Sequence, residues 1–184
     1  MCDVVCHDAD VSVLFNCQSL MKTLYLLRHA KSSWDDPELK DLERPLADRG
    51  LRDIPKMASR FQKRGDTVDC VVPSPALRAK TTAKMIASQI GFPPDEIASN
   101  PELYFAGASM LLKAVRLLDA NCQSAMLVGH NPAITAFADG ICDGRIDHIP
   151  TCGLLKLQFP VQHWEEIKEA LGQLVYFDYP KKEV

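Results

Sequence analysis

From residue 22 onward, short apolar runs alternate with stretches of helical periodicity, and this alternation constrains the fold more than any other feature. The run Thr23–Leu27 is almost continuously apolar, as a central strand buried on both faces should be. Four further strands are predicted downstream, at 68–72, 125–128, 154–159 and 174–179. The pattern predicts an α/β fold in which helices pack on a sheet.

Helices are predicted between these strands, at 51–61, 74–90, 109–118, from 131 onward, and at 163–171. Two of them begin with a polar residue followed by proline, at Ser74-Pro75 and Asn131-Pro132. Ser and Asn side chains cap helices, and proline suits the first helical position because its missing N–H needs no partner there. No internal repeat or linker interrupts the pattern, so one domain is expected.

The composition excludes several classes of partner. The chain has 184 residues, of which 47% are hydrophobic, enough to bury the core of one domain. Its formal net charge of -3 gives no overall attraction to nucleic acid or anionic lipid, and no apolar run approaches the roughly 20 residues that span a bilayer. The seven cysteines form no disulfide framework, which favours reduced thiols and a cytoplasmic location. Neither nucleic acid nor membrane is therefore an expected partner.

Residues 1–20 differ from the remainder because they contain no Lys or Arg. They lack the charged start of a signal peptide and the Arg-rich face of a transit peptide, so we expect a poorly ordered extension, with a targeting role as the alternative. Zinc binding by Cys2, Cys6 and His7 is a further alternative, although nothing downstream supplies a second matching pair. The folded domain is expected to comprise residues 21–184.

Two predicted strands end in a histidine. One runs into Arg28-His29, and another runs into Gly129-His130. Ligands of open α/β sheets bind beyond the carboxyl ends of the strands, so both imidazoles reach one crevice if the two strands are adjacent. Either histidine alone has a structural explanation, as a hydrogen-bonded group at a strand end. Arg78, in the first turn of the second predicted helix, adds a guanidinium and the positive end of a helix at the same edge.

The combination of Arg28, His29, Arg78 and His130 resembles the signature of the histidine phosphatase superfamily, also called phosphoglycerate-mutase-like. That signature is Arg-His-Gly after the first strand, a later Ser-x-x-x-Arg segment, and a Gly-His or Ala-His pair near the end. The resemblance covers residues 22–179 and has three separated motifs in the expected order. It implies a three-layer α/β/α sandwich around a mostly parallel sheet.

Within this superfamily, the segments 28–36 and 44–50 are similar to those of the small bacterial phosphohistidine phosphatases and their uncharacterised relatives. Ala30 stands where the signature has glycine. Its methyl group narrows the backbone approach and disfavours a positive φ, and we expect little consequence from either effect.

The resemblance implies that His29 takes the phosphoryl group from the substrate. The ring would attack through one neutral nitrogen while its other nitrogen donates to an orienting acceptor. Arg28 and Arg78 would bind phosphoryl oxygens, and their charge would lower the pKa of His29. His130 would donate a hydrogen bond to the same group. Because the arginines supply the positive charge, no metal ion or other cofactor is expected.

The proton donor for the leaving group is a separate question. Glu102 lies in the stretch where many relatives that cleave phosphate esters carry an acid, and the alternative is a surface carboxylate. The phosphohistidine phosphatases resemble this chain in lacking the strong acid motif, since a P–N bond leaves readily from a protonated imidazole. Ser32 and Asn131 are candidate substrate contacts, or ordinary loop and helix-cap residues.

The sequence therefore predicts a metal-independent phosphatase that works through a phosphohistidine enzyme intermediate, on protein phosphohistidine or small phospho-compounds. The alternatives are a small-molecule phosphate-ester phosphatase or a mutase of the same superfamily, although mutases tend to be longer. A catalytically silent phosphate-binding module is the third alternative, but binding alone does not need a nucleophile. The expected partner is a phosphorylated protein or small molecule, and no pattern indicates an oligomeric state.

Overall fold

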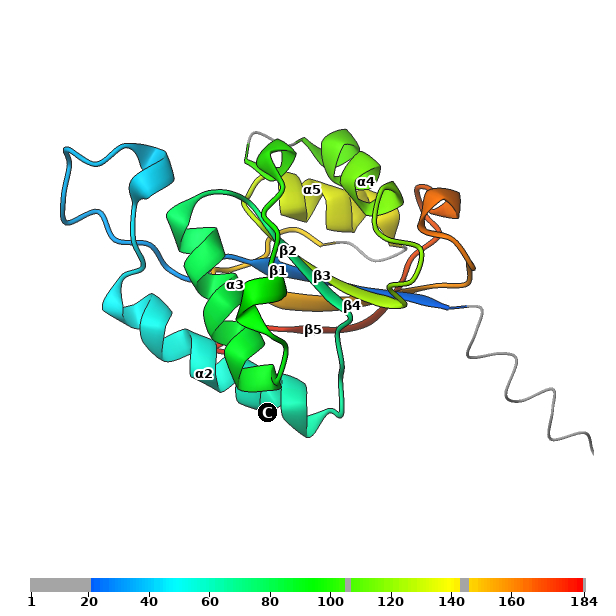
Figure 1. Cartoon of the computed structure of the whole chain (residues 1–184), viewed down its shortest axis with the longest axis horizontal. Helices are drawn as coiled ribbons and strands as arrows, with labels where there is room; N and C mark the ends of the chain where they lie inside the picture. Colours follow the sequence, from blue (N-terminus) through cyan, green and yellow to red (C-terminus); the bar gives the residue numbers. More distant parts are fainter. Residues whose placement is uncertain (1–20, 105–106, 143–145, 184) are drawn as a thin grey trace, which may run out of the picture.

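The computed structural model describes residues 21–104, 107–142 and 146–183. Within these ranges the chain forms a five-stranded sheet in the order β2-β3-β1-β4-β5 (Figure 1). The strands are β1 (Lys22–Arg28), β2 (Cys70–Pro73), β3 (Ser124–Gly129), β4 (Leu154–Phe159) and β5 (Gln173–Asp178). Each of them overlaps a strand predicted from the apolar runs.

The sheet is mixed, so the expectation of a mostly parallel sheet is wrong. β1 and β2 both pair with β3 in parallel, whereas β4 pairs antiparallel with β1 and with β5. Helical crossovers return the chain to the same edge between the first three strands, as parallel pairing requires. The segment before β4 instead brings the chain to the carboxyl end of β1, where Leu154 pairs with Leu27, so β4 runs in the opposite direction.

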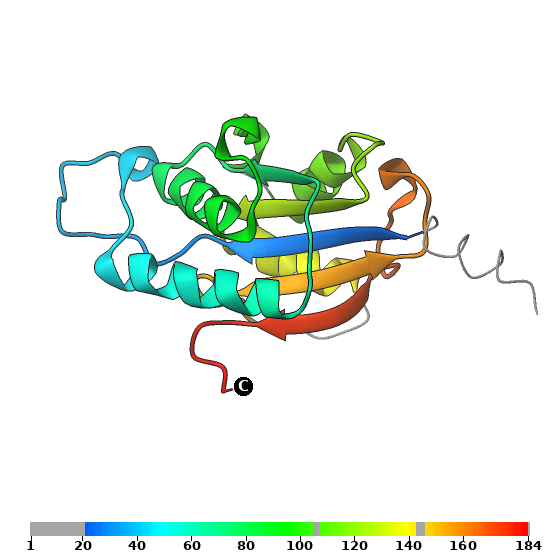
Figure 2. The same cartoon turned by 60° about the horizontal axis from the view of Figure 1, so that its bottom comes forward.

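Helices cover both faces of the sheet (Figures 1 and 2). They are α2 (Asp48–Lys63) and α3 (Leu77–Ile90) on one face, and α4 (Ala108–Arg116) and α5 (Ala133–Ile141) on the other. Alternate residues of β1 point to opposite faces, as in any strand. Tyr25 and Leu27 pack in the core beneath α2 and α3, while Leu24 and Leu26 pack beneath α4 and α5. The expected three-layer sandwich is confirmed.

The helix predicted at 163–171 is wrong, because only the 3₁₀ turn η5 (Trp164–Glu166) forms there. Trp164 and Ile167 are buried in the core, and Ala170 has a left-handed φ of 55°, which ends helical geometry. Without a helix to cross the sheet, the chain returns directly to form β5 antiparallel to β4. The other 3₁₀ turns are η2 (Asp41–Glu43), η3 (Pro94–Glu96) and η4 (Pro101–Leu103).

No helix in the described part of the chain is long and apolar enough to cross a membrane. Among the described residues, Cys70, Cys122 and Cys152 are free thiols. The predicted N-terminal extension at 1–20 lies outside the described residues, as do its alternatives of targeting and of zinc binding by Cys2, Cys6 and His7.

Candidate active site

Three neighbouring parallel strands end at the same edge of the sheet, and each delivers a polar side chain there. β1 and β3 pair so that Arg28 lies opposite Gly129, which places His29 and His130 directly after them at the same level. The centroids of the two imidazole rings are 4.9 Å apart. Ser74 follows β2, and its Oγ lies 2.7 Å from Nε2 of His130. The two strands are adjacent, so the condition under which both imidazoles reach one crevice is met.

His29 is buried, with one ring nitrogen engaged by the backbone. Its Nδ1 lies 2.7 Å from the carbonyl oxygen of Ala30. A carbonyl only accepts, so Nδ1 carries the proton and Nε2 presents a lone pair. The pKa of His29 is lowered to about 3, mainly because burial disfavours the charged ring. The hydrogen bond to Ala30 opposes this shift, and the charges of the neighbouring histidine and two arginines add to it. The ring is therefore neutral at neutral pH, and burial contributes more to this than the predicted arginine charges.

Ala30, which stands where the signature has glycine, fits the structure without a left-handed backbone. Among the described non-glycine residues, positive φ occurs at Cys152 and Ala170 and not here. The Ala30 side chain is buried in the core beneath α2 and α3, and its N–H donates to Oγ1 of Thr82 at 3.0 Å. The Thr82 hydroxyl donates to the carbonyl oxygen of Arg78 at 2.7 Å. Thr82 thereby connects the segment after β1 to the first turn of α3.

Both predicted arginines are anchored by protein oxygen atoms. Arg28 donates from Nη1 to the carbonyl oxygen of Ile149 at 2.7 Å, while its Nε is buried without a partner among the described residues. Arg78 donates from Nη1 to the carbonyl oxygen of Asp41 at 2.5 Å and from Nη2 to the carboxylate of the same residue at 2.8 Å. These contacts fix the planes of two guanidinium groups beside the two histidines.

Asp41, in the turn η2, joins three side chains from different parts of the sequence. Its carboxylate accepts hydrogen bonds from Tyr104 at 2.7 Å, from Arg78 at 2.8 Å and from Arg44 at 2.9 Å. The Tyr104 hydrogen bond, followed by Arg78, lowers the pKa of Asp41 to about 2, against the opposing effect of partial burial. Asp41 is therefore an anion at neutral pH. Sequence reasoning missed both Asp41 and Tyr104, which no recognisable spacing connects.

The side chains at this edge line a cavity of about 210 Å³. On one wall, Arg44 donates from Nη2 to Oγ of Ser32 at 2.8 Å and stacks 3.2 Å from the ring centre of Trp34. The described lining residues include four cations and no carboxylate, a wall that suits a multiply charged oxyanion such as phosphate. No group of three or more described His, Cys, Asp or Glu residues is placed to hold a metal ion. The lining comprises Arg28, His29, Lys31, Ser32, Trp34, Arg44, Arg78, His130, Asn131 and Thr151.

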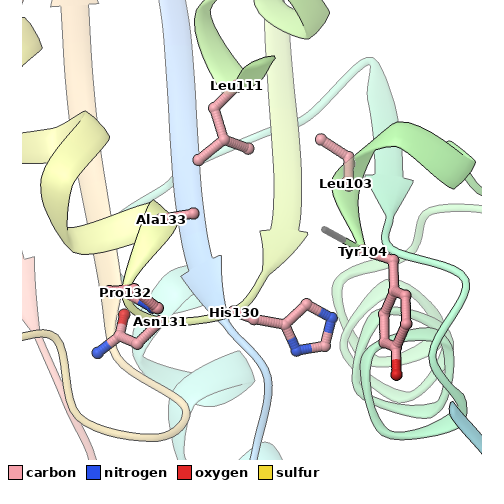
Figure 3. Close-up of a pocket in the computed structure, with 7 residues that line it drawn as sticks. All are labelled: Leu103, Tyr104, Leu111, His130, Asn131, Pro132 and Ala133. Atoms are coloured by element: carbon pink, nitrogen blue, oxygen red, sulfur yellow. The ribbon is translucent and has the colours of Figure 1, made fainter. Parts of the chain in front are cut away.

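A second cavity, also about 210 Å³, adjoins the first and shares His130 and Asn131 with it (Figure 3). Figure 3 shows the His130 ring extending toward Tyr104, and the ring centroids of these two residues are 5.9 Å apart. The apolar part of the lining is formed by Leu103, Leu111, Pro132 and Ala133. His130 therefore borders both a basic cavity and a more apolar one.

Comparison with known proteins identifies the family. Residues 24–106 match the family model of the histidine phosphatase superfamily (branch 1). An uncharacterised chloroplastic protein of Arabidopsis thaliana is 31% identical over 156 residues, which cover 80% of this chain and 71% of the relative. The chain belongs to the histidine phosphatase superfamily.

Solved structures share the fold of this histidine phosphatase. The proposed phosphohistidine phosphatase SixA of Agrobacterium tumefaciens is 27% identical, with a TM-score of 0.73 over 86% of this chain and 98% of that one. The proposed SixA of Nakamurella multipartitia is 22% identical, with a TM-score of 0.74 over 88% of this chain and 98% of that one. The resemblance drawn from the sequence motifs is confirmed, and the protein is an enzyme of the phosphatase class.

The remaining candidates of the histidine phosphatase site are placed differently. The Glu102 carboxylate is 44% exposed, lies 3.6 Å from Nζ of Lys113, and lines neither cavity. Ser32 lines the basic cavity, but its hydroxyl already accepts from Arg44. The structure thus brings Arg28, His29, Arg78 and His130 together with Ser32 and leaves Glu102 outside.

Asn131 also lines the basic cavity, yet both ends of its amide are used by the protein. Nδ2 donates to the carbonyl oxygen of Ile149 at 3.1 Å, and Oδ1 accepts from the hydroxyl of Thr135 at 2.9 Å. The prediction that Asn131 caps a helix is wrong, because the cap position of α5 is Pro132 and Asn131 instead ties the strand end to the loop at 149.

Proposed function

We propose that this phosphatase forms a covalent phosphohistidine on Nε2 of His29 and then hydrolyses it. The Nε2 lone pair attacks phosphorus while the bond to the leaving group breaks, and the leaving group departs with that electron pair and a proton. Water then attacks the phosphorus of the phosphohistidine, the P–N bond breaks, and inorganic phosphate leaves with His29 restored. The observation that carries this proposal is a buried, neutral imidazole whose Nδ1 is engaged, while Nε2 has no hydrogen-bond partner among the described residues.

The cationic wall supports the same proposal. Arg28 and Arg78 lie beside the reacting ring in the cavity, where their guanidinium groups balance the charge on the phosphoryl oxygens as it moves between donor and His29. Lys31 and Arg44 add two further positive charges to the lining. This charge comes from the chain itself, so we propose that turnover requires no metal ion.

We propose protein phosphohistidine or a small phospho-compound with a similarly good leaving group as substrate. Asp41 is held as an anion at neutral pH, and Glu102 lines neither cavity, so neither is arranged to protonate the leaving group. A phosphoramidate needs less help, because its imidazole leaving group can carry its own proton. The similarity to the proposed phosphohistidine phosphatase SixA of Agrobacterium tumefaciens supports this choice.

A phosphorylated protein is the partner we propose for the cavity mouth. Trp34 lines the basic cavity and is 72% exposed, and the Arg44 guanidinium stacks on its ring. An exposed aromatic ring beside a cationic pocket offers apolar contact to the chain that carries the phosphoryl group. We further propose that residues 21–184 form the phosphatase domain. The free thiols of Cys70, Cys122 and Cys152 support the proposal of a reducing, cytoplasmic location.

The test compares His29→Ala with the control His163→Ala, whose exposed side chain caps the turn η5, outside both cavities. Both proteins are assayed with a phosphohistidine protein and with p-nitrophenyl phosphate, in the presence and absence of EDTA. We expect His29→Ala to lose at least about 10³-fold in turnover together with the acid-labile, base-stable phosphoenzyme, while the control and EDTA change little. Retained turnover in His29→Ala would reject the proposal.

A further inference from the structure

Ser74 has a role that its position in the sequence does not reveal. It was predicted to cap the helix that follows it, but α3 begins at Leu77 with Ala76 at the cap position. The Ser74 side chain is fully buried, and its Oγ lies 2.7 Å from Nε2 of His130 instead. The predicted helix forms, but the prediction that Ser74 caps it is wrong, because this hydroxyl is engaged with the imidazole that follows the neighbouring strand.

The hydrogen bond between Ser74 and His130 has two proton arrangements. In the first, Ser74 donates its hydroxyl proton to Nε2, and the proton of the neutral ring is on Nδ1. In the second, Nε2–H donates to Oγ, and the hydroxyl proton must find another acceptor. Among the described residues, Nε2 of His130 is the only acceptor bonded to Oγ, whose other partner is the donating N–H of Ala76 at 3.4 Å.

The first arrangement, in which Ser74 donates to Nε2, is favoured because it alone satisfies every hydrogen bond of the buried Ser74 hydroxyl. The second would leave a hydroxyl proton without an acceptor at a site that solvent does not reach, and buried polar groups without partners are costly and rare. In the first arrangement, Oγ accepts from Ala76 and donates to Nε2, so Ser74 is fully satisfied.

The other nitrogen of His130 provides an independent observation. Nδ1 is buried and has no hydrogen-bond partner among the described residues, although the ring lines the basic cavity next to His29. An unpaired nitrogen on a ring that lines the basic cavity is explained if its hydrogen-bond partner is the substrate. A phosphoryl oxygen would be that partner.

We propose that Ser74 is a positioning residue that fixes the Nδ1–H tautomer of His130, so that the neutral imidazole donates a hydrogen bond to the phosphoryl group. The inference rests on the proposed function, because it gives the phosphoryl group as the acceptor. Burial, followed by the charge of Arg78, lowers the pKa of His130 to about 4 against the opposing charge of Asp41. His130 consequently carries a single ring proton at neutral pH, and its location decides whether the ring donates to the ligand.

The tautomer is measured directly in the resting enzyme by ¹⁵N NMR of the His130 ring at neutral pH. We expect a protonated Nδ1 and an unprotonated Nε2 in the wild type. In Ser74→Ala we expect the proton to be redistributed to Nε2. The loss of one hydrogen bond to a charged group should give a 10- to 100-fold weaker affinity for inorganic phosphate (about 1.4–2.8 kcal/mol) and a comparable loss in kcat/KM. Ser74→Thr keeps a hydroxyl and should retain the wild-type tautomer.

The matched control is Ser124→Ala. Ser124 is also a buried serine at a strand end, but it begins β3 at the opposite edge of the sheet and bonds to Asp69. It should alter stability without changing the His130 tautomer or phosphate affinity. A wild-type spectrum with the proton on Nε2 overturns the inference, even if Ser74→Ala does not fold. Unchanged tautomer and phosphate affinity in a folded Ser74→Ala would also overturn it, whereas activity retained by His29→Ala would reject the proposed function alone.

Discussion

Arg78 is shared between the protein and the proposed substrate. Two of its guanidinium nitrogens contact Asp41, one through the backbone carbonyl and one through the carboxylate. The planar fork can hold these contacts and still present an edge to an anion, which the compact ammonium group of lysine cannot do. Asp41 therefore orients the arginine before substrate arrives, and Tyr104 and Arg44 hold Asp41 in turn.

Replacing Arg78 by Lys should consequently reduce kcat/KM by about 10- to 100-fold, the loss of one hydrogen bond to a charged group, with the fold intact. Steady-state kinetics on p-nitrophenyl phosphate and a thermal melt would measure both quantities. Arg116→Lys is the control, because Arg116 on α4 donates to the carbonyl oxygen of Ile167 and lines neither cavity. Equal kinetics for the Arg78 variant and the control would contradict the role given to the guanidinium fork.

The sequence identified the residues that lie immediately next to strands and failed for those on loops. His29 and His130 follow apolar runs, and Arg78 follows a recognisable helix start, so the rule for strand ends placed them on one edge. Asp41 and Tyr104 meet across 63 residues, and no periodicity specifies how two irregular loops approach each other. Glu102, predicted only from the stretch of sequence it occupies, falls on the exposed side of the turn η4.

Helix α2 packs unusually closely against the segment that follows His29. A Cβ atom added at Gly50 would lie 2.3 Å from the carbonyl oxygen of Lys31, a backbone atom that already accepts a hydrogen bond from Ala47. Lys31 is two residues after His29. The absence of a side chain at Gly50 therefore allows α2 to pack close to the backbone that carries the proposed nucleophile.

We expect Gly50→Ala to destabilise the protein by about 1–3 kcal/mol and to lower turnover, since the backbone after His29 must move to relieve the overlap. Gly140→Ala is the matched control: Gly140 lies within α5, and a Cβ there meets no atom of the described residues within 4 Å. Alanine is the better helix former by up to about 1 kcal/mol, so the control should be neutral or more stable. Urea unfolding of both variants measures the contrast, and equal stabilities would show that the α2 contact is not restrictive.

The strands were predictable because each is a compact apolar run, whereas their directions were not. Nothing in the residues 154–159 distinguishes a parallel from an antiparallel partner. The direction of each strand depends on the connection that precedes it. The connection between β4 and β5 is predicted as a helix at 163–171 because its apolar residues have helical spacing, and this prediction is wrong. Burial of Trp164 and the left-handed backbone at Ala170 override that spacing in the folded chain.

The fold keeps the imidazoles of His29 and His130 neutral beside the arginines at the end of the sheet. This arrangement makes the free energy of unfolding depend on pH. The pKa of His29 is about 3 and that of His130 about 4 in the folded state, against an ordinary value of 6.5. As pH falls below 6.5, the unfolded chain takes up protons that the folded chain does not. The free energy of unfolding must therefore decrease through this window, until the folded-state pKa values are reached.

Between pH 6.5 and 5, we expect each of the two histidines to reduce the free energy of unfolding by about 2 kcal/mol. Asp41 does not contribute in this window, because its pKa is lowered and its stabilising effect is lost only as pH falls from 3.8 toward 2. Urea unfolding at several pH values, in buffers free of phosphate, gives the slope for the wild type, His29→Asn and His130→Asn. Each variant should remove about half of the slope. If both site variants retain the full pH dependence, the imidazoles are not neutral in the folded protein, and the case for His29 as a ready nucleophile fails with them.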